Sequence, residues 1–279
     1  MKKITRRSFL AAAGLTAAAL ALTACGGSSS STASSTASSA ASSEAASSSA
    51  AAELTTVEAG KLTMATNATF PPYEMTTDTG AFEGIDVDTA QAIAEKLGLE
   101  LQIDDMEFDA ALLSVQQGKA DIVMAGVTVT DERKAVMDFS GSYATGIQSI
   151  IVPEGSDIAT PDDLAGKKIG TQRGTTGFLY CSDDFGDDNV IGFDDGATAV
   201  QNLKAGKIDC VVIDNVPAQE YVKANPGLTI LDTEYANEDY AIGIAKDNTA
   251  LQEALNKALA ELKADGTIQS IIDKYIPAK

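Results

Sequence analysis

The sequence predicts an α/β fold in two lobes, each built on a mainly parallel β-sheet flanked by helices. From about residue 57 onward, stretches with strand character alternate with stretches that carry apolar residues at helical spacing. This alternation is typical of parallel sheets covered by helices on both faces. A helix, the residues Gly-Lys-x-Asp and an apolar strand occur together at Gly118 and again at Gly206, which indicates two similar sheets.

The first half of the folded region predicts strands and helices in turn. Strands are expected at 62–67, 99–103 and 121–125, helices at 86–97 and 108–117, and an extended run at 143–152. The first helix has apolar residues at helical spacing from Val87 to Leu97, and Gly98 is placed to cap its end. A further helix is expected after Thr130, a good N-cap residue, because two acidic residues follow where the helix dipole favours negative charge.

The second half repeats this alternation. Helices are expected at 161–164, from 174–177 onward, at 197–204 and at 217–224, strands at 168–172, 189–193, 208–213 and 228–231, and an extended run at 240–245. The chain closes with a helical pattern from Leu251 to Tyr275, which Gly266 divides into two helices.

The repeated unit predicts a cleft between two equivalent strand ends, because open sheets of this kind bind ligands at the carboxyl ends of their strands. Alignment of the two copies sets Gly126 opposite Asp214. One wall then offers backbone amides, hydroxyls and Arg133, and the other offers Asp214 and the helix start at 174–176. A cation on one wall and an anion on the other suit a dipolar ligand.

The first 24 residues have the pattern of an export signal. Two lysines and two arginines precede the apolar run 9–22, which is too short to span a membrane in a mature protein. The run ends at residues 22–25, Leu-Thr-Ala-Cys, which look like a lipobox whose Cys25 is lipidated and becomes the new N-terminus; a chance cysteine after an ordinary cleavage site is the alternative. Residues 5–10 resemble a twin-arginine signal, and a general secretory signal with two arginines is equally open.

A flexible tether is expected after the signal. Residues 26–52 are almost all serine, alanine and threonine and have no periodic apolar face, so they cannot bury enough surface to fold. We therefore expect a signal peptide at 1–24 and a lipidated cysteine with its tether at 25–56.

The charge excludes two classes of partner. The formal net charge is −20, and loss of the first 24 residues, with four basic and no acidic residues, takes it to −24. Such a chain does not bind nucleic acid through counterion release. Anionic headgroups also repel it, so membrane attachment has to come from lipid on Cys25.

Histidine and cysteine usage narrows the chemistry. The chain has no histidine, which excludes histidine-based triads and most transition-metal sites. Cys181 and Cys210 match no zinc spacing and are expected to be buried free thiols, with a disulfide between them as the alternative. No metal and no cofactor is expected.

Four segments together resemble the extracellular solute-binding proteins of polar amino-acid ABC importers, family 3, which include glutamine- and histidine-binding proteins. They are 67–74, 84–88, 125–133, and 174–176 with Asp214, and they span nearly all of residues 60–279. The resemblance implies the type II periplasmic-binding-protein fold, with extended hinge crossovers near 143–149 and 237–242. Lobe 1 is then expected at 57–145 and 240–279, and lobe 2 at 146–239.

The resemblance also implies a role for each charged residue. Arg133 grips the α-carboxylate of an amino acid, as a planar guanidinium fork can. Backbone N–H groups at the helix start 174–176 share that charge. Asp214 takes the α-ammonium group, with help from Gly126 and Thr128.

The remaining site positions concern the ligand side chain. Phe70 and Phe108 match positions that sandwich the ligand, and Asn67 matches a position that reads its side chain. The neutral amide of Asn67 argues for an uncharged polar ligand side chain. The expected ligand-binding set is Asn67, Phe70, Phe108, Ala125, Gly126, Thr128, Arg133, Gln172, Thr175, Thr176 and Asp214.

Each of these residues also has a structural alternative. Arg133 can be a solvated helix residue, Asp214 a helix cap, and the two phenylalanines plain core. Tyr73 and Glu74 are expected to be structural or interlobe residues rather than ligand contacts. The two charged residues are expected to face a wet, open cleft and to add little to the stability of the ligand-free protein.

The implied function is a transport receptor, not an enzyme. It closes around one polar L-amino acid and presents the closed form to an ABC permease and its ATPase subunits, which requires higher affinity for the closed state. We expect a monomer held by lipid at the outer face of the cytoplasmic membrane. An amino-acid-sensing surface lipoprotein and a dehydratase-type enzyme on the same scaffold are the alternatives.

Overall fold

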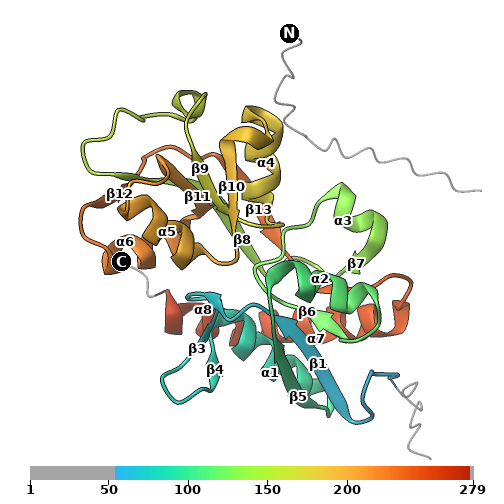
Figure 1. The fold of residues 1–279 in the computed structure, drawn as a ribbon. Coiled ribbons are helices and arrows are strands. Elements are labelled where there is room, and N and C mark those ends of the chain that lie inside the picture. The colour runs from blue at the N-terminus through green and yellow to red at the C-terminus, as the bar shows by residue number, and fades with distance from the viewer. Residues whose placement is uncertain (1–53, 277–279) are drawn as a thin grey trace, which may run out of the picture. The chain divides into compact units, whose positions relative to one another are not determined.

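A computed structural model describes residues 54–276 (Figure 1). The expected signal peptide, Cys25 and all but the last residues of the expected tether lie outside the described residues. Between Leu54 and Ile276, no helix is both long enough and apolar enough to cross a bilayer.

The first sheet has the strand order β5-β1-β6-β14-β7. Its strands are β1 (Lys61–Thr66), β5 (Glu100–Asp105), β6 (Ile122–Val123), β7 (Met137–Phe139) and β14 (Gly243–Ala245). β1 runs parallel to β5 and β6, whereas β14 is antiparallel to β6 and β7.

Helices cover both faces of this sheet, because the side chains of its strands point alternately to one face and the other. Its helices are α1 (Ile85–Leu97), α2 (Phe108–Gln116), α7 (Thr249–Ala264) and α8 (Thr267–Tyr275), and α3 (Asp131–Val136) leads into β7. Leu62 and Met64 pack in one cluster with α1, α7 and α8, whereas Ala65 and Val123 pack in another with α2. Successive strand residues point to opposite faces, so one short strand supplies both clusters.

The second sheet has the order β10-β9-β11-β8-β12, and β13 pairs with β8 beside this path. Its strands are β8 (Ala144–Pro153), β9 (Ile169–Gln172), β10 (Val190–Phe193), β11 (Cys210–Asp214), β12 (Leu228–Ile230) and β13 (Ala236–Tyr240). β9 is parallel to β10 and β11, whereas β8 is antiparallel to β11, β12 and β13.

This sheet too is covered on both faces. Its helices are α4 (Thr176–Phe185), α5 (Gly196–Lys204) and α6 (Asn215–Ala224), with short 3-10 turns η1 (Pro161–Leu164) and η2 (Asp187–Asn189). Val211 and Ile213 pack with α5 and α6, and Cys210 packs with Cys181 of α4 on the other face. Both cysteines are buried free thiols, as predicted.

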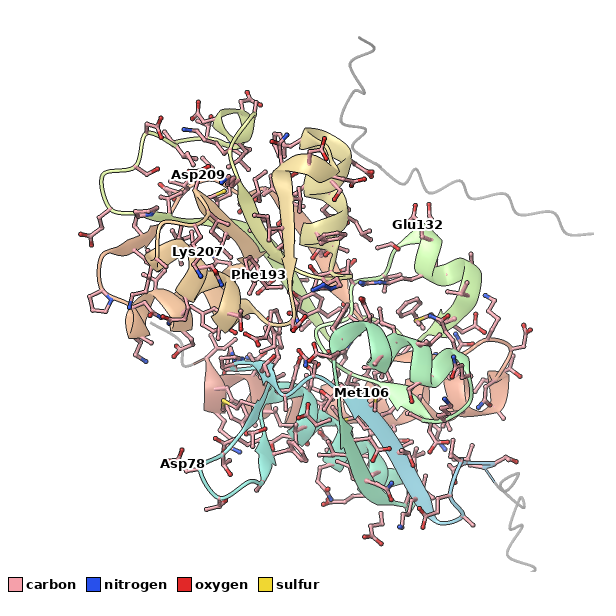
Figure 2. The ribbon with its side chains drawn as sticks, in the orientation of Figure 1. Asp78, Met106, Glu132, Phe193, Lys207 and Asp209 are labelled. Carbon is pink, nitrogen blue, oxygen red and sulfur yellow. The ribbon has the colours of Figure 1, made fainter. Side chains whose placement is uncertain are left out.

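The repeated Gly-Lys-x-Asp unit has the same local structure in both copies. Each glycine is left-handed, with φ of 65° at 118 and 67° at 206. The Asp121 amide donates to Thr63 O at 2.9 Å, and its carboxylate accepts from Thr63 N at 2.7 Å. Asp209 exchanges the same pair of bonds with Lys168, at 2.8 and 2.7 Å (Figure 2 labels Asp209). The aspartate therefore ties the start of its strand to the neighbouring parallel strand.

Two adjacent strands connect the sheets. β8 and β13 pair in antiparallel register from Ala144 opposite Tyr240 to Gln148 opposite Ala236, and Figure 1 shows them side by side. Tyr240 also pairs with Thr128 from the first sheet's side. These strands overlap the extended crossovers that the family resemblance implied near 143–149 and 237–242.

The sequence missed several short strands. The three-stranded sheet of β2 (Thr69–Phe70), β3 (Glu74–Thr76) and β4 (Phe82–Glu83) was not predicted, nor was β7. The run expected at 240–245 is two strands, β13 ending at Tyr240 and β14 beginning at Gly243. Each main sheet is mixed: three of its strands are parallel as predicted, and the crossover and C-terminal strands add antiparallel pairs.

Candidate ligand-binding site

A small polar cavity of about 30 Å³ lies between the two main sheets, at the carboxyl ends of their parallel strands. It brings together every residue of the expected ligand-binding set: Asn67, Phe70, Phe108, Ala125, Gly126, Thr128, Arg133, Gln172, Thr175, Thr176 and Asp214. Five further lining residues were not expected: Glu74, Gln148, Val212, Ile213 and Tyr240.

Arg133 turns inward from a short capped helix. The Thr130 hydroxyl accepts from Arg133 N at 3.2 Å, which fixes the start of α3. Glu132, the next residue back, is exposed and points outward (Figure 2), whereas Arg133 is only 7% exposed. The expectation of a wet, open setting and the alternative of a solvated helix residue are both wrong for this arrangement.

The guanidinium group of Arg133 bridges the two walls. Nη1 donates to Thr128 O at 2.8 Å, and Nη2 donates across the cavity to Gly174 O at 3.1 Å. The guanidinium carbon lies 5.4 Å from the centre of the Phe108 ring, within cation–π range. These two hydrogen bonds use two of the five N–H groups of a guanidinium, so the fork retains donors for a carboxylate.

Asp214 ends β11 and caps α6. Its Oδ1 accepts from Val216 N at 3.1 Å, and its Oδ2 accepts from Ile147 N at 2.9 Å and from the Tyr240 hydroxyl at 2.7 Å. Burial raises the pKa of Asp214 to about 6, while these hydrogen bonds oppose the rise. Asp214 is therefore a helix cap through Oδ1, as the structural alternative proposed. Through Oδ2 it also binds both crossover strands.

Close packing around Asp214 requires a glycine. A Cβ atom at Gly146 would lie 2.5 Å from the Tyr240 hydroxyl and 2.6 Å from Asp214 Oδ2. Side chains do not approach this closely, so β8 can pass the carboxylate only with a glycine at this position.

The start of α4 forms part of the wall opposite Arg133. The Thr175 hydroxyl accepts from Phe178 N at 3.3 Å and donates to Gln172 O at 2.7 Å. Gly174 is left-handed, with φ of 75°, and turns the chain into the helix. Helix N-termini present backbone N–H groups that favour a bound anion.

An amide pair crosses the cavity between the sheets. Gln172 Nε2 donates to Asn67 Oδ1 at 2.8 Å, and Asn67 Nδ2 donates to the backbone oxygen of Met106 at 2.9 Å (Figure 2 labels Met106). Phe70 stacks on Tyr73 with ring centres 5.7 Å apart, and its edge lies against Gly126. The two amides and Phe70 line the cavity, and Tyr73 supports Phe70 from outside the lining.

Glu238 of β13 is a second acidic group that the sequence did not single out. It is 7% exposed, and its Oε2 accepts from the Thr128 hydroxyl and from Gln148 Nε2, both at 3.0 Å. It orients two polar residues that line the cavity. Its position in a stretch with no apolar pattern gave no signal of burial.

Glu74 is the least expected lining residue. It is fully buried, and neither carboxylate oxygen has a hydrogen-bond donor among the described residues. Burial, and then the neighbouring Asp86, raise the pKa of Glu74 well above its usual value. The sequence placed Glu74 among structural residues, although an acid inside the motif 67–74 was a usable signal.

Among residues 54–276, no group of three or more histidine, cysteine, aspartate or glutamate residues is arranged to hold a metal ion.

The chain is similar to amino-acid-binding proteins over most of its length. The family model for bacterial extracellular solute-binding proteins, family 3, matches residues 62–278. The L-cystine-binding protein TcyJ of Escherichia coli (strain K12) is 34% identical over 225 residues, covering 79% of this chain and 84% of that protein. ABC transporter arginine-binding protein 1 of the same strain is 33% identical over 224 residues, covering 78% and 92%.

Solved structures share the fold. An ancestral arginine-binding protein bound to glutamine has 41% identity and a TM-score of 0.75, covering 78% of this chain and 99% of that one. The ancestral protein bound to arginine has 42% identity and a TM-score of 0.74, covering 78% and 98%. These neighbours confirm the predicted two-lobed type II periplasmic-binding-protein fold.

Proposed function

Since this chain belongs to family 3 of the bacterial extracellular solute-binding proteins, we propose that it is the receptor of an ABC importer and binds a polar L-amino acid between its lobes. One observation carries the proposal. A buried cation, Arg133, and a buried anion, Asp214, line the same small cavity from opposite walls. We propose that the receptor acts as a monomer and does not bind nucleic acid.

The charged pair suits the two groups that all α-amino acids share. We assign the α-carboxylate to the remaining N–H groups of Arg133 and to the start of α4. We assign the α-ammonium group to Asp214, with Gly126 and Thr128, which line the same cavity. The ligand side chain then extends toward Asn67, Phe70 and Glu74.

Closure of the lobes is the proposed signal to the permease. Three hydrogen bonds cross between the proposed lobes: Arg133 to Gly174 O at 3.1 Å, Gln172 to Asn67 at 2.8 Å and Tyr221 to Thr69 O at 2.8 Å. A ligand that contacts both walls binds this form better than an open one, which shifts the population toward it. We propose lobe 1 at 57–145 and 240–279, and lobe 2 at 146–239.

The proposed location rests on the sequence of the N-terminal residues 1–56. We propose export with a signal at 1–24, lipidation at Cys25 and a tether at 25–56, so that the receptor stays near its permease. An amino-acid-sensing lipoprotein differs in having no permease partner. We propose no enzymatic activity, because Asp214 is assigned to the ammonium group of the ligand and the chain has no histidine to act as a base.

Two classes of ligand side chain fit different parts of the cavity. The amides of Asn67 and Gln172 favour an uncharged polar side chain, as the sequence led us to expect. The donor-free carboxyl of Glu74 favours a cationic one. The two amides therefore support an uncharged polar ligand side chain, and Glu74 supports a cationic one.

A thermal-shift panel of the twenty L-amino acids with the purified protein tests the proposal. A ligand at 100 times its dissociation constant adds about 2.7 kcal/mol to the free energy of unfolding, which raises the melting temperature clearly. We expect a small set of polar L-amino acids to do this. A panel with no shift, together with a shift by a sugar, would show the proposal to be wrong.

A further inference from the structure

Glu74 and Asp86 form a buried carboxyl pair beside the cavity. Glu74 lies on β3, Asp86 in the first turn of α1, and both are 0% exposed. Three of their four carboxylate oxygens, both of Glu74 and Oδ1 of Asp86, have no donor among the described residues. The two side chains lie within hydrogen-bond reach of each other. Two carboxyl groups can share a hydrogen bond only if one of them carries a proton.

The fourth oxygen connects the pair to the ligand-binding wall. Asp86 Oδ2 accepts from Gly126 N at 2.9 Å and from the Tyr143 hydroxyl at 2.7 Å. These two donors stabilise Asp86 as the carboxylate, which leaves Glu74 to carry the proton. The pKa values agree in direction: that of Glu74 is raised well above normal by burial and by Asp86, and burial raises that of Asp86 to about 6.

No basic group pairs with either acid: Arg133 lines the same cavity as Glu74, but its hydrogen bonds go to Thr128 O and Gly174 O. The titratable groups that act on Glu74 and Asp86, or on which they act, are Asp105, Tyr73, Tyr143 and Tyr221. None of them is basic, and neither acid takes part in an ion pair within residues 54–276. Two unprotonated carboxylates would thus place two uncompensated negative charges out of water, which is very costly.

We propose that the cationic side chain of a bound amino acid, of the arginine or lysine class, displaces a proton held between Glu74 and Asp86, so that binding releases about one proton to solvent. This inference rests on the proposed function and extends it to the ligand class. Before binding, the pair holds one proton and one negative charge. After binding, it holds two negative charges and the ligand one positive charge, so the net buried charge stays the same.

The placement of the pair makes the exchange specific. Glu74 lines the same cavity as Arg133 and Asp214, which we assign to the α-carboxylate and α-ammonium groups. A ligand held at those two groups can present only its side chain to Glu74. A neutral side chain brings no charge to replace the proton, so it leaves the pair protonated.

Calorimetric titration in two buffers tests the exchange. L-arginine is titrated into the protein at pH 7 in phosphate and in Tris, whose ionisation enthalpies differ, and L-glutamine serves as the neutral comparison. The difference in heat between the buffers counts the protons released. We expect about one proton for arginine and none for glutamine. Arginine affinity should also rise up to about tenfold per pH unit between pH 6 and 7.

Two variants assign the proton to its residue. Glu74→Gln keeps the shape of the side chain but cannot ionise, so arginine binding should weaken at least tenfold and release no proton. Asp78→Asn removes the same charge from the exposed turn between β3 and β4 (Figure 2) and should behave as the wild type. Melting curves of both variants report whether they fold.

The outcomes separate the inference from the proposed function. Arginine binding without proton release in the wild-type protein overturns the inference. Glutamine binding without arginine binding also overturns it, while the proposed function stands. If no amino acid binds, the proposed function itself fails.

Discussion

The substitution Arg133→Lys tests the hydrogen-bonding geometry of the guanidinium group separately from its positive charge. In the structure Arg133 donates to Thr128 O and Gly174 O, at 2.8 and 3.1 Å, and keeps further N–H groups for a ligand carboxylate. Lysine keeps the positive charge but cannot make two parallel hydrogen bonds to a carboxylate while it also bridges the two walls. Loss of one charge-assisted hydrogen bond costs about 1.5–3 kcal/mol, which lowers ligand affinity about 10- to 150-fold.

The same substitution should destabilise the ligand-free protein. Sequence alone predicted little effect, on the assumption of a wet cleft, but Arg133 is 7% exposed and both hydrogen bonds are to backbone oxygens. Replacement leaves a buried oxygen without its donor, at about 1–3 kcal/mol. Titration calorimetry gives the affinity, and denaturant unfolding of the ligand-free form gives the stability. Wild-type affinity in the variant would refute the role of the fork in ligand binding.

Three further predictions concern other parts of the molecule. Gly146→Ala should lower stability by about 1–3 kcal/mol and weaken binding, because its Cβ would meet Tyr240 and Asp214, whereas Gly141→Ala, with its nearest neighbour 3.7 Å away, should be nearly neutral in denaturant unfolding. Since burial raises the pKa of Asp214 to about 6, its contribution to stability is complete below the unfolded-state value near 3.8 and is lost as pH rises through 6. The ligand-free wild type should therefore gain up to about 3 kcal/mol over Asp214→Asn between pH 8 and pH 4, and a constant difference in calorimetric scans would contradict this. Cys25→Ser should move the protein from the membrane fraction to the soluble fraction of fractionated cells, and a membrane-bound variant would reveal a second anchor.

Elements with local signals were predictable from the sequence. Thr130 before two acidic residues gives the start of α3, and the Thr175 cap gives the start of α4. The glycines after α2 and α5, with Asp121 and Asp209, gave the internal repeat, because each pattern acts over a few residues. The helix caps need no partner from a distant part of the chain, whereas the bonds of Asp121 and Asp209 to Thr63 and Lys168 could not be read from the repeat itself.

Elements that depend on distant pairing were not predictable. β2 to β4 are two or three residues long, and β13 has the polar sequence Ala-Asn-Glu-Asp-Tyr, so neither shows a clear apolar pattern. β13 exists because it pairs with β8, almost a hundred residues away in the chain. Its location could be anticipated only through the resemblance to a known fold.

The residues of the candidate site were also predictable only in part. The resemblance pointed to residues that the structure gathers around one cavity, such as Arg133, Asp214 and Asn67. It did not indicate that Arg133 is buried, or that Glu74 and Asp86 are buried without a basic partner. Burial of a charged group depends on every segment that packs against it, and a sequence motif does not contain those segments.

The central claim is that Arg133 and Asp214 hold the two charged groups of an L-α-amino acid. The most direct test is calorimetric titration of the wild-type protein with the L- and D-enantiomers of the amino acid that gives the largest thermal shift. With both charges held, the D-enantiomer has to move its side chain out of the pocket near Asn67 and Glu74. We predict one-to-one binding of the L-enantiomer and at least tenfold weaker binding of the D-enantiomer. Equal affinity for the two enantiomers, or no binding of either, would contradict the claim.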